Sequence, residues 1–219
     1  MCGRFSIWSD KNKILEHYGL QVGSDVLKNY NIPPTYTIPT IRINGSKELV
    51  NMYWGYLPSW AKDEKYKVTS ATSEKILAKK PFYKDSFNKR RCLIPLNGYY
   101  EWYQDSKPKQ PFFIKVKDFE IMSFAGIWDT WDTSDGVREG CTLITTPPPK
   151  QIEFIHHRTP VIINPSEYDE WLEEGGDKFI APYKGKFDYW PVSTRVNQVK
   201  NQGIELIERI PWPTTIPKQ

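Results

Sequence analysis

Few residues of this 219-residue chain are suited to disulfide or metal chemistry. It contains three cysteines, Cys2, Cys92 and Cys141, and three histidines, two of which are adjacent. The cysteines are odd in number and form no C-x-x-C pair, which argues against a disulfide framework and favours a reducing compartment. So few ligand residues also argue against a structural zinc site, and we expect no bound metal.

Long apolar runs are missing as well. The first residues, MCGRFSIWSDKNK, hold no apolar segment of a signal peptide, and no window approaches the length of a membrane span. We therefore expect a cytoplasmic protein with no membrane partner. Because there is no Ser/Gly-rich linker, low-complexity tract or repeat between residues 20 and 205, the sequence predicts one domain over 1–210, followed by a proline-rich tail at 211–219.

Aromatic residues are abundant, whereas excess charge is small. Nine Trp, 13 Tyr and 10 Phe make up 15% of the chain, and the net charge is +4. Most of these rings must belong to a core, but exposed rings can also stack on unpaired nucleic-acid bases. The mild positive charge permits a polyanionic partner without requiring one.

Several short segments rich in β-branched and aromatic residues predict strands. They are ELVNMYWGYL (48–57), CLIPLNGYYEWY (92–103), PFFIKVK (111–117), IMSFAGIWDTW (121–131), CTLITT (141–146) and TPVIIN (159–164). Helices are predicted at 9–19, capped by Ser9, and at 164–175, capped by Asn164, with a helical piece at 73–80. Because strands and helices do not alternate regularly, we expect an α+β fold: a single domain with a curved, mostly antiparallel sheet or partial barrel and peripheral helices.

The opening pentapeptide, MCGRF, places a cysteine one processing step from the N-terminus. If Met1 is removed, Cys2 presents a thiol, with a reference pKa of about 8.5, and a free α-amine, with one of about 7.7 to 8.0. An aldehyde condenses with such an amine to an imine, and the thiolate can close onto the imine carbon to give a thiazolidine ring. The same two groups can instead act as an N-terminal nucleophile on an amide. On the residues alone, both chemistries stay open.

Two further motifs carry groups suited to proton transfer. In NGYYEW, Glu101 lies among aromatic residues. These rings would remove water from its carboxylate and raise its pKa, unless the side chain faces solvent from a strand. In IHHRTPVII, His156 or His157 can move protons near pH 7, and Arg158 can bind a phosphate or a carboxylate. A histidine pair of this kind also occurs for purely structural reasons.

Taken together, six blocks in this order resemble the SOS-response-associated peptidase (SRAP) family over nearly the whole chain. The blocks are MCGRF (1–5), YNIPP (30–34), WGYLPSWAKD (54–63), RRCLIPLNGYYEW (90–102), IHHRTPVII (155–163) and VSTRVNQVKNQG (192–203). Class II glutamine amidotransferases share only the first three letters. Six ordered blocks are much more specific than any one of them.

The resemblance implies a protein that senses abasic sites in single-stranded DNA and captures them covalently. In this family the initiator methionine is removed, and Cys2 forms a thiazolidine DNA–protein crosslink that shields the lesion. The family also implies weak lyase activity at abasic sites and, as a self-processing peptidase, removal of Met1. By this resemblance Glu101 assists the imine chemistry and His156 transfers a proton at the sugar oxygen. No cofactor is implied, and we expect a monomer that associates with the nucleoid when bound to DNA.

The DNA contacts that we predict are spread along the chain. Arg4, two residues from Cys2, can bind a phosphate beside the lesion, and Trp60 is a candidate for base stacking. Asn31 and Asn201 are expected to bond backbone or phosphate near the site. The full set of predicted DNA-binding residues is Arg4, Asn31, Trp60, Lys67, Ser70, Thr72, Arg158 and Asn201.

The segment YKVTSATSEK (66–75) departs from the family pattern, which usually reads I-N-A-R-x-E. Ser70 and Thr72 therefore stand where the family has an asparagine and an arginine. Loss of the arginine removes a charge-assisted contact worth about 1.5 to 3 kcal/mol, so DNA positioning is weakened or another cation replaces it. His157, where a carboxamide or carboxylate is common, is a second departure next to His156. The candidate replacement cations are Lys67, Lys75 and Arg4.

Two functions of other classes remain open. A non-covalent single-stranded-DNA-binding module would leave Cys2 idle, so Cys2→Ala would not change its affinity for abasic DNA. An N-terminal-nucleophile amidohydrolase or peptidase would turn over peptide or glutamine substrates without DNA.

Overall fold

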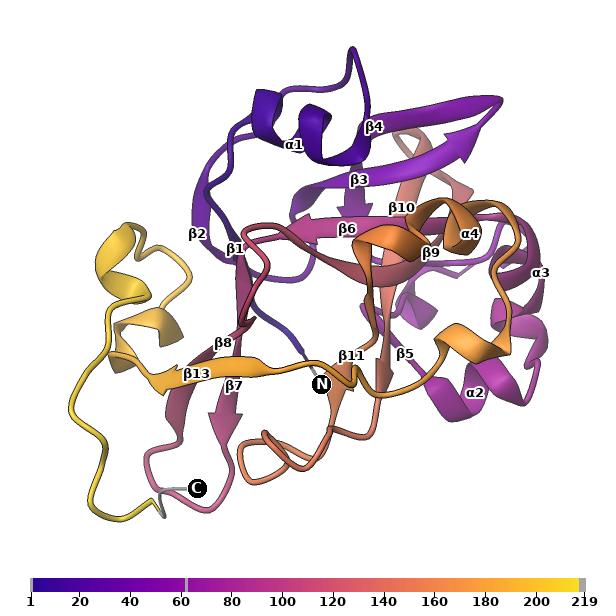
Figure 1. Cartoon of the computed structure of the whole chain (residues 1–219). Coiled ribbons are helices and arrows are strands. Elements are labelled where there is room, and N and C mark those ends of the chain that lie inside the picture. Colours follow the sequence, from indigo (N-terminus) through magenta and orange to yellow (C-terminus); the bar gives the residue numbers. More distant parts are fainter. Residues whose placement is uncertain (1, 62, 217–219) are drawn as a thin grey trace.

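Two β-sheets dominate the computed structural model, which describes residues 2–61 and 63–216 (Figure 1). The smaller sheet has five strands, which pair antiparallel throughout. Their order across the sheet is β13 (Phe187–Pro191), β8 (Gln110–Val116), β7 (Gly98–Tyr103), β1 (Phe5–Ile7) and β2 (Asn29–Ile32). This sheet carries the N-terminal end of the chain.

The larger sheet closes into a ring, because β10 pairs with both β9 and β4. The ring is completed by the pairs β4–β3, β3–β6 and β6–β9, which are antiparallel. These strands are β3 (Thr37–Asn44), β4 (Ser46–Trp54), β6 (Arg91–Leu96), β9 (Met122–Thr133) and β10 (Gly136–Thr146). Three short strands extend the ring: β5 (Ser70–Thr72), β11 (Thr159–Pro160) and β12 (Ile162–Ile163). The predicted α+β domain with a mostly antiparallel partial barrel is confirmed.

The first helix, α1 (Lys11–Tyr18), confirms the helix predicted at 9–19. Its cap, however, is Asp10 and not Ser9. The Asp10 side chain accepts a hydrogen bond from the Lys13 amide at 3.0 Å, whereas Ser9 is buried and its hydroxyl accepts from the Asn97 amide group. Gly19 ends the helix at φ +66°, a left-handed conformation that glycine adopts without strain.

The other α-helices lie on one side of the barrel, and the C-terminal segment runs along the other side next to β13 (Figure 1). They are α2 (Ser73–Leu77), α3 (Pro81–Lys89) and α4 (Tyr168–Glu173). The sequence predicted α2 and α4 but missed α3, whose few apolar residues are separated by polar and basic ones. The predicted cap Asn164 instead donates to the Glu167 carboxylate, and a 3-10 turn (Pro165–Glu167) precedes α4. Among the described helices, none is long and apolar enough to cross a membrane.

Most aromatic rings lie in the core, as expected. Phe5 packs against Trp54 of the barrel at 5.0 Å between ring centroids and against Phe124 at 6.4 Å. Because β1 is only three residues from Cys2, this contact fixes the start of the chain between the two sheets. Burial of such rings is the main stabilising contribution to the fold.

The predicted tail is only partly extended. Trp212 packs against Phe112 at 5.3 Å between centroids, and Ile216 is buried. Residues 217–219 lie outside the described part of the chain. The boundary at residue 210 therefore stays a prediction.

A buried arginine, Arg91, joins the ends of α3 and α4. The residue is 5% exposed, and its guanidinium donates five hydrogen bonds of 2.5–3.1 Å. The acceptors are the backbone carbonyls of Phe87, Asn88, Trp171, Leu172 and Glu173. The last carbonyls of a helix have no partner within the helix, so Arg91 satisfies two helix ends at once.

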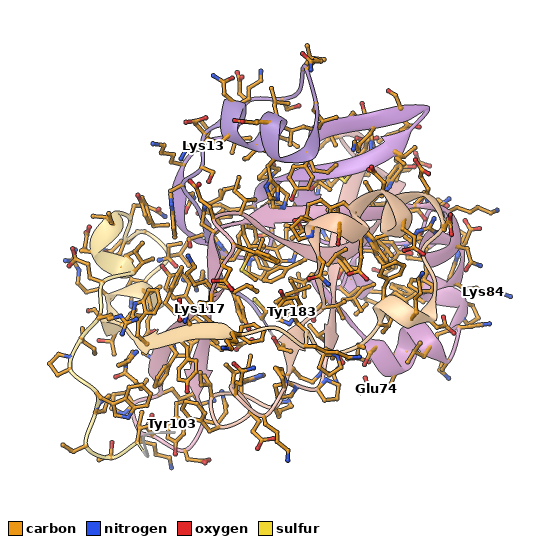
Figure 2. All side chains as sticks on the ribbon, in the orientation of Figure 1. Lys13, Glu74, Lys84, Tyr103, Lys117 and Tyr183 are labelled. Atoms are coloured by element: carbon orange, nitrogen blue, oxygen red, sulfur yellow. The ribbon has the colours of Figure 1, made fainter. Side chains whose placement is uncertain are left out.

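We predict that Arg91→Met destabilises the fold by about 3 kcal/mol or more, because it leaves several buried carbonyls without donors. Urea denaturation measures the free energy of unfolding. The matched control is Lys84→Met, at an exposed position on the outside of α3 (Figure 2), which should change that free energy by less than about 0.5 kcal/mol. Equal unfolding free energies of the two variants would contradict the structural role of Arg91.

Candidate functional site

Strand pairing brings the start of the chain alongside Glu101. Phe5 pairs with Tyr99, and the Tyr100 amide donates to the Arg4 carbonyl at 2.9 Å. Continuing this antiparallel register by one residue brings Gly3 opposite Glu101. The Cys2 side chain is 2% exposed, and its Sγ lies 3.8 Å from the Arg4 carbonyl oxygen.

The Cys2 thiol is kept protonated by its surroundings. Burial raises the pKa of the thiol well above its usual value, and the charge of a neighbouring Glu101 carboxylate raises it further. A thiolate therefore forms only when a nearby base takes the proton. Met1, whose removal would free the Cys2 amine, lies outside the described residues.

Glu101 is a carboxyl group in a dry site. It is 3% exposed, and its Oε1 has no hydrogen-bond partner within the described chain. Burial raises the pKa of Glu101 to about 8, so at neutral pH the group holds a proton. The predicted loss of water around this carboxyl group is borne out by its burial, and the alternative of a solvent-facing glutamate is excluded.

His156 lies across from this carboxyl group. Its Nδ1 is 3.9 Å from Glu101 Oε2, and its side chain is largely buried. The same Nδ1 is 3.1 Å from both the backbone nitrogen and the backbone oxygen of Arg158. The N–H can donate to an unprotonated Nδ1 and the carbonyl can accept from a protonated one, so both protonation states have a partner.

Burial reverses the protonation state that Glu101 has in water at pH 7 and keeps His156 neutral down to a lower pH. Burial lowers the pKa of His156 to about 4, while the pKa of Glu101 is about 8. At pH 7 the carboxyl is therefore neutral and protonated and the imidazole is neutral and unprotonated. Their 3.9 Å contact is polar, without ionic charge. The site thus offers one proton to give and two groups that can later accept one.

Arg158 is held by a carboxylate. Its Nη1 and Nη2 donate to the two oxygens of Glu74 at 2.7 and 3.1 Å, and Nη2 also donates to the Thr145 carbonyl at 2.6 Å. Glu74 projects from α2 (Figure 2), and the bond to Arg158 lowers the pKa of Glu74 to about 2. The Nε of Arg158 is buried and has no partner among the described residues. A phosphate at Arg158 would therefore share the guanidinium with Glu74.

The two residues that depart from the family pattern lie next to this ion pair. Ser70 and Thr72 are on β5, which pairs in parallel with β10 so that Thr72 faces Thr145. Lys67, the other predicted contact of this segment, donates to Glu64 at 3.1 Å and lies 5.4 Å from the ring centre of Tyr53. Whether these residues contact DNA stays a prediction.

His157 stacks on His156 from the solvent side. The ring centroids are 4.3 Å apart with an interplanar angle of 30°. His157 is exposed, so it covers one face of the buried imidazole. The two histidines that sequence reasoning could not tell apart thus differ in burial, and only His156 contacts Glu101.

Three of the predicted DNA contacts form a cluster within the protein. Arg4 donates to Asn31 at 2.6 Å, and Asn31 is fully buried. The Asn201 side chain donates to the Arg195 carbonyl at 2.7 Å. The structure brings these residues together close to Cys2, but it gives Asn31 no exposed surface.

Trp60 is the exposed ring of its motif. It is 61% exposed, whereas Trp54 and Tyr56 are fully buried. Trp60 lines a groove of about 460 Å³, and the other side chains that shape it include Tyr66, Val68, Lys75, Lys80 and Phe82. Sequence reasoning missed Lys80 and Phe82 as groove residues because α3 was not predicted, and it also missed Tyr66, which ends a 3-10 turn (Glu64–Tyr66). The signal for Lys80 and Phe82 is the aromatic pair that follows the lysine pair in KKPFY (79–83).

Within the described residues, no group of three or more His, Cys, Asp and Glu side chains could hold a metal ion.

We predict that Glu101→Gln stabilises the protein at alkaline pH. The pKa of Glu101 rises from about 4.5 in the unfolded chain to about 8 in the fold, so the native state binds more protons between these values and wild-type stability falls as pH rises. The neutral amide removes this dependence. Urea denaturation should show the variant becoming more stable than wild type as pH increases from 5 to 9.

The contribution of His156 does not confuse this comparison, because the pKa of His156 is lowered to about 4 and its effect is constant above about pH 7.5. Parallel pH profiles of wild type and Glu101→Gln would contradict a raised Glu101 pKa.

A family model and several individual proteins match this chain over most of its length. The family described as SOS response associated peptidase (SRAP) matches residues 1–199. The abasic site processing protein YoqW of Bacillus subtilis is 36% identical, covering 95% of this chain and 99% of YoqW. The abasic site processing protein YedK of Escherichia coli is 27% identical, over 96% of this chain and all of YedK.

A more distant relative and a solved structure also match this chain. The abasic site processing protein HMCES of Gallus gallus is 28% identical over 80% of this chain and 61% of HMCES. A crystal structure of a protein from Bacteroides thetaiotaomicron superposes with a TM-score of 0.84 at 26% identity, covering 95% of this chain and all of that one. The family match spans most of the chain and includes Cys2, Glu101 and His156. The chain therefore belongs to the SRAP family.

Proposed function

We propose that this protein captures abasic sites in single-stranded DNA by forming a covalent crosslink through Cys2. The observation that carries the proposal is the burial of Cys2 beside a protonated Glu101 whose Oε1 has no partner among the described residues. An N-terminal cysteine in such a site is a reagent for an aldehyde, and the open form of an abasic sugar is an aldehyde. The relatives named abasic site processing proteins support this substrate.

The reaction balances with the groups at hand. Once Met1 is absent, the Cys2 amine adds to the aldehyde carbon, and protonated Glu101 donates to the resulting hydroxyl, which leaves as water. The Glu101 carboxylate then takes the thiol proton. The sulfur attacks the carbon of the protonated imine, whose nitrogen has kept one amine proton and now receives the C=N electron pair, so Glu101 ends protonated as it began. One C–N and one C–S bond form, one water leaves, and no oxidant is needed.

His156 is suited to open the sugar ring. A neutral imidazole can accept the proton of the hemiacetal hydroxyl and return a proton to the ring oxygen, so ring opening consumes none. The backbone of Arg158 provides a partner for Nδ1 in either state, which keeps the imidazole orientation fixed during the exchange.

DNA binding is supported by donors that lack protein acceptors. Arg4 Nε and Arg158 Nε are both buried and unpaired among the described residues, and the two arginines lie two residues from Cys2 and His156 in the sequence. Two phosphates flanking an abasic nucleotide would provide acceptors for them. The exposed ring of Trp60, with Lys75 and Lys80 in the same groove, is suited to stack an unpaired base and neutralise its phosphate.

The finer activities follow from the same intermediate. While the imine persists, the sugar C2 proton is acidic, and its loss expels the 3′ phosphate, which is the weak lyase reaction. Thiol closure competes with this elimination. We expect removal of Met1 to precede both reactions because an acylated amine cannot form the imine.

The test is a denaturing gel of purified protein with a single-stranded oligonucleotide that carries one abasic site. Intact mass first establishes that Met1 is absent. Wild type should give a shifted band without reductant, whereas Cys2→Ser, which keeps the amine but lacks the thiol, should give one only after borohydride trapping of the imine. Absence of a band from wild type with a free Cys2 would instead favour the non-covalent binding module.

We predict that Glu101→Gln slows crosslinking by about 100-fold or more, because the amide cannot donate and accept the protons. The readout is the single-turnover rate, with binding of the uncrosslinked oligonucleotide measured separately. The wild-type rate should also fall above about pH 8, where Glu101 loses its proton. A wild-type rate that still rises from pH 8 to pH 9 would exclude protonated Glu101 as the donor.

A further inference from the structure

Asn31 is an unusual candidate for a DNA contact because both polar atoms of its side chain already have hydrogen-bond partners within the protein. It is fully buried on β2. Its Oδ1 accepts from Arg4 Nη1 at 2.6 Å. Its Nδ2 lies within 3.0–3.2 Å of three carbonyl oxygens, those of Val196, Gln198 and Asn201.

These three carbonyls belong to one irregular segment, residues 194–201. The segment begins with a 3-10 turn (Thr194–Asn197) and makes no strand pairing over its described length. Outside regular strand pairing such a segment needs donors from elsewhere, and Asn31 supplies them to the buried Val196 and to the carbonyls of Gln198 and Asn201. A register shift between β1 and β2, at Phe5–Ile7, coincides with the position of Asn31 and lets its side chain reach this segment.

Arg4 is held at several points, but only through part of its guanidinium. Nη1 donates to both Asn31 Oδ1 and the Val196 carbonyl, the latter at 2.9 Å. The Arg4 carbonyl accepts from the Tyr100 amide, which fixes the backbone next to Glu101. Neither Nε nor Nη2 has a hydrogen-bond partner among the described residues. The unused edge of the Arg4 guanidinium, formed by Nε and Nη2, is the edge that can donate two parallel hydrogen bonds to an anion.

We propose that Asn31 is a positioning residue and not a direct DNA contact: it locks Nη1 of Arg4 against segment 194–201, so that the Nε–Nη2 edge is preset for a phosphate beside the abasic nucleotide. The inference rests on the proposed function for the identity of the anion. It assigns Asn31 a role through Arg4, which alone touches the phosphate. Holding the long arginine side chain in advance also removes the entropy that binding would otherwise cost.

The experiment measures non-covalent binding of a single-stranded oligonucleotide with a tetrahydrofuran abasic analogue, which has no aldehyde and cannot crosslink. Affinity is determined over a series of salt concentrations for wild type, Arg4→Ala, Asn31→Ala and the double variant. Each phosphate contact adds about 0.7 to the slope of log affinity against log salt for a single strand. Arg4→Ala and Asn31→Ala should each lower the slope by about that amount, and the double variant should lose no more than either.

The matched control is Gln202→Ala. Gln202 ties the end of the same segment to β2 through the Tyr30 amide at 3.0 Å, but it does not contact Arg4. This variant should keep the wild-type salt slope even if its unfolding free energy falls. Urea denaturation of every variant checks folding, and Asn31→Ser, whose short hydroxyl cannot reach both Arg4 and the segment, replaces Asn31→Ala if the alanine variant does not fold.

Three results would overturn the inference: a wild-type slope in folded Asn31→Ala or Asn31→Ser, a wild-type slope in Arg4→Ala, or additive losses in the double variant. Failure of this inference can be told apart from failure of the proposed function. Crosslinking is assayed with DNA that bears an aldehyde, whereas the binding test uses the tetrahydrofuran analogue, which has none. A wild-type protein that binds the analogue with an Arg4-dependent slope but never crosslinks would sustain the inference and refute covalent capture. Wild type without any affinity for the oligonucleotide would refute both.

Discussion

The pairing of β1 with β7 is the constraint on which the rest of the site depends. Phe5 is anchored in the core by Trp54, and the Arg4 carbonyl is bonded to β7, so the first residues of the chain are drawn in beside Glu101. Water is excluded at the same time. Loss of hydration raises the pKa of Glu101 and lowers that of His156, and both groups are therefore neutral when the substrate arrives.

Much of this arrangement was predictable because it depends on local sequence. The strand segments, α1 and the mixed α+β class follow from composition and spacing, and the aromatic neighbours of Glu101 indicated a dry carboxyl group. The closure of the barrel through β10 did not follow, since it depends on pairing between strands far apart in the chain. Helix α3 was missed because its buried positions, Tyr83 and Phe87, are too few to give a clear apolar period.

The contacts of the basic residues were the least predictable part of the site. Sequence alone presents Arg4, Asn31 and Arg158 as equivalent polar candidates near a nucleophile. The structure separates them, because Asn31 is buried under segment 194–201, Arg4 keeps one free edge and Arg158 is shared with Glu74. Such differences arise from partners more than 25 residues away, as in the Arg4–Asn31 bond, where separation in sequence is 27. Spacing within a motif carries no information about them.

In the proposed reaction, both the amine and the thiol of Cys2 bond to one sugar carbon. The most direct test is mass spectrometry of the proteolysed N-terminal peptide after reaction with abasic DNA and nuclease digestion, with borohydride and a thiol-alkylating reagent as probes. Covalent capture predicts an adduct on Cys2 that is lighter than its two components by one water, resists reduction and is not alkylated. An adduct at a lysine, or one on Cys2 whose thiol is still alkylated, would contradict it.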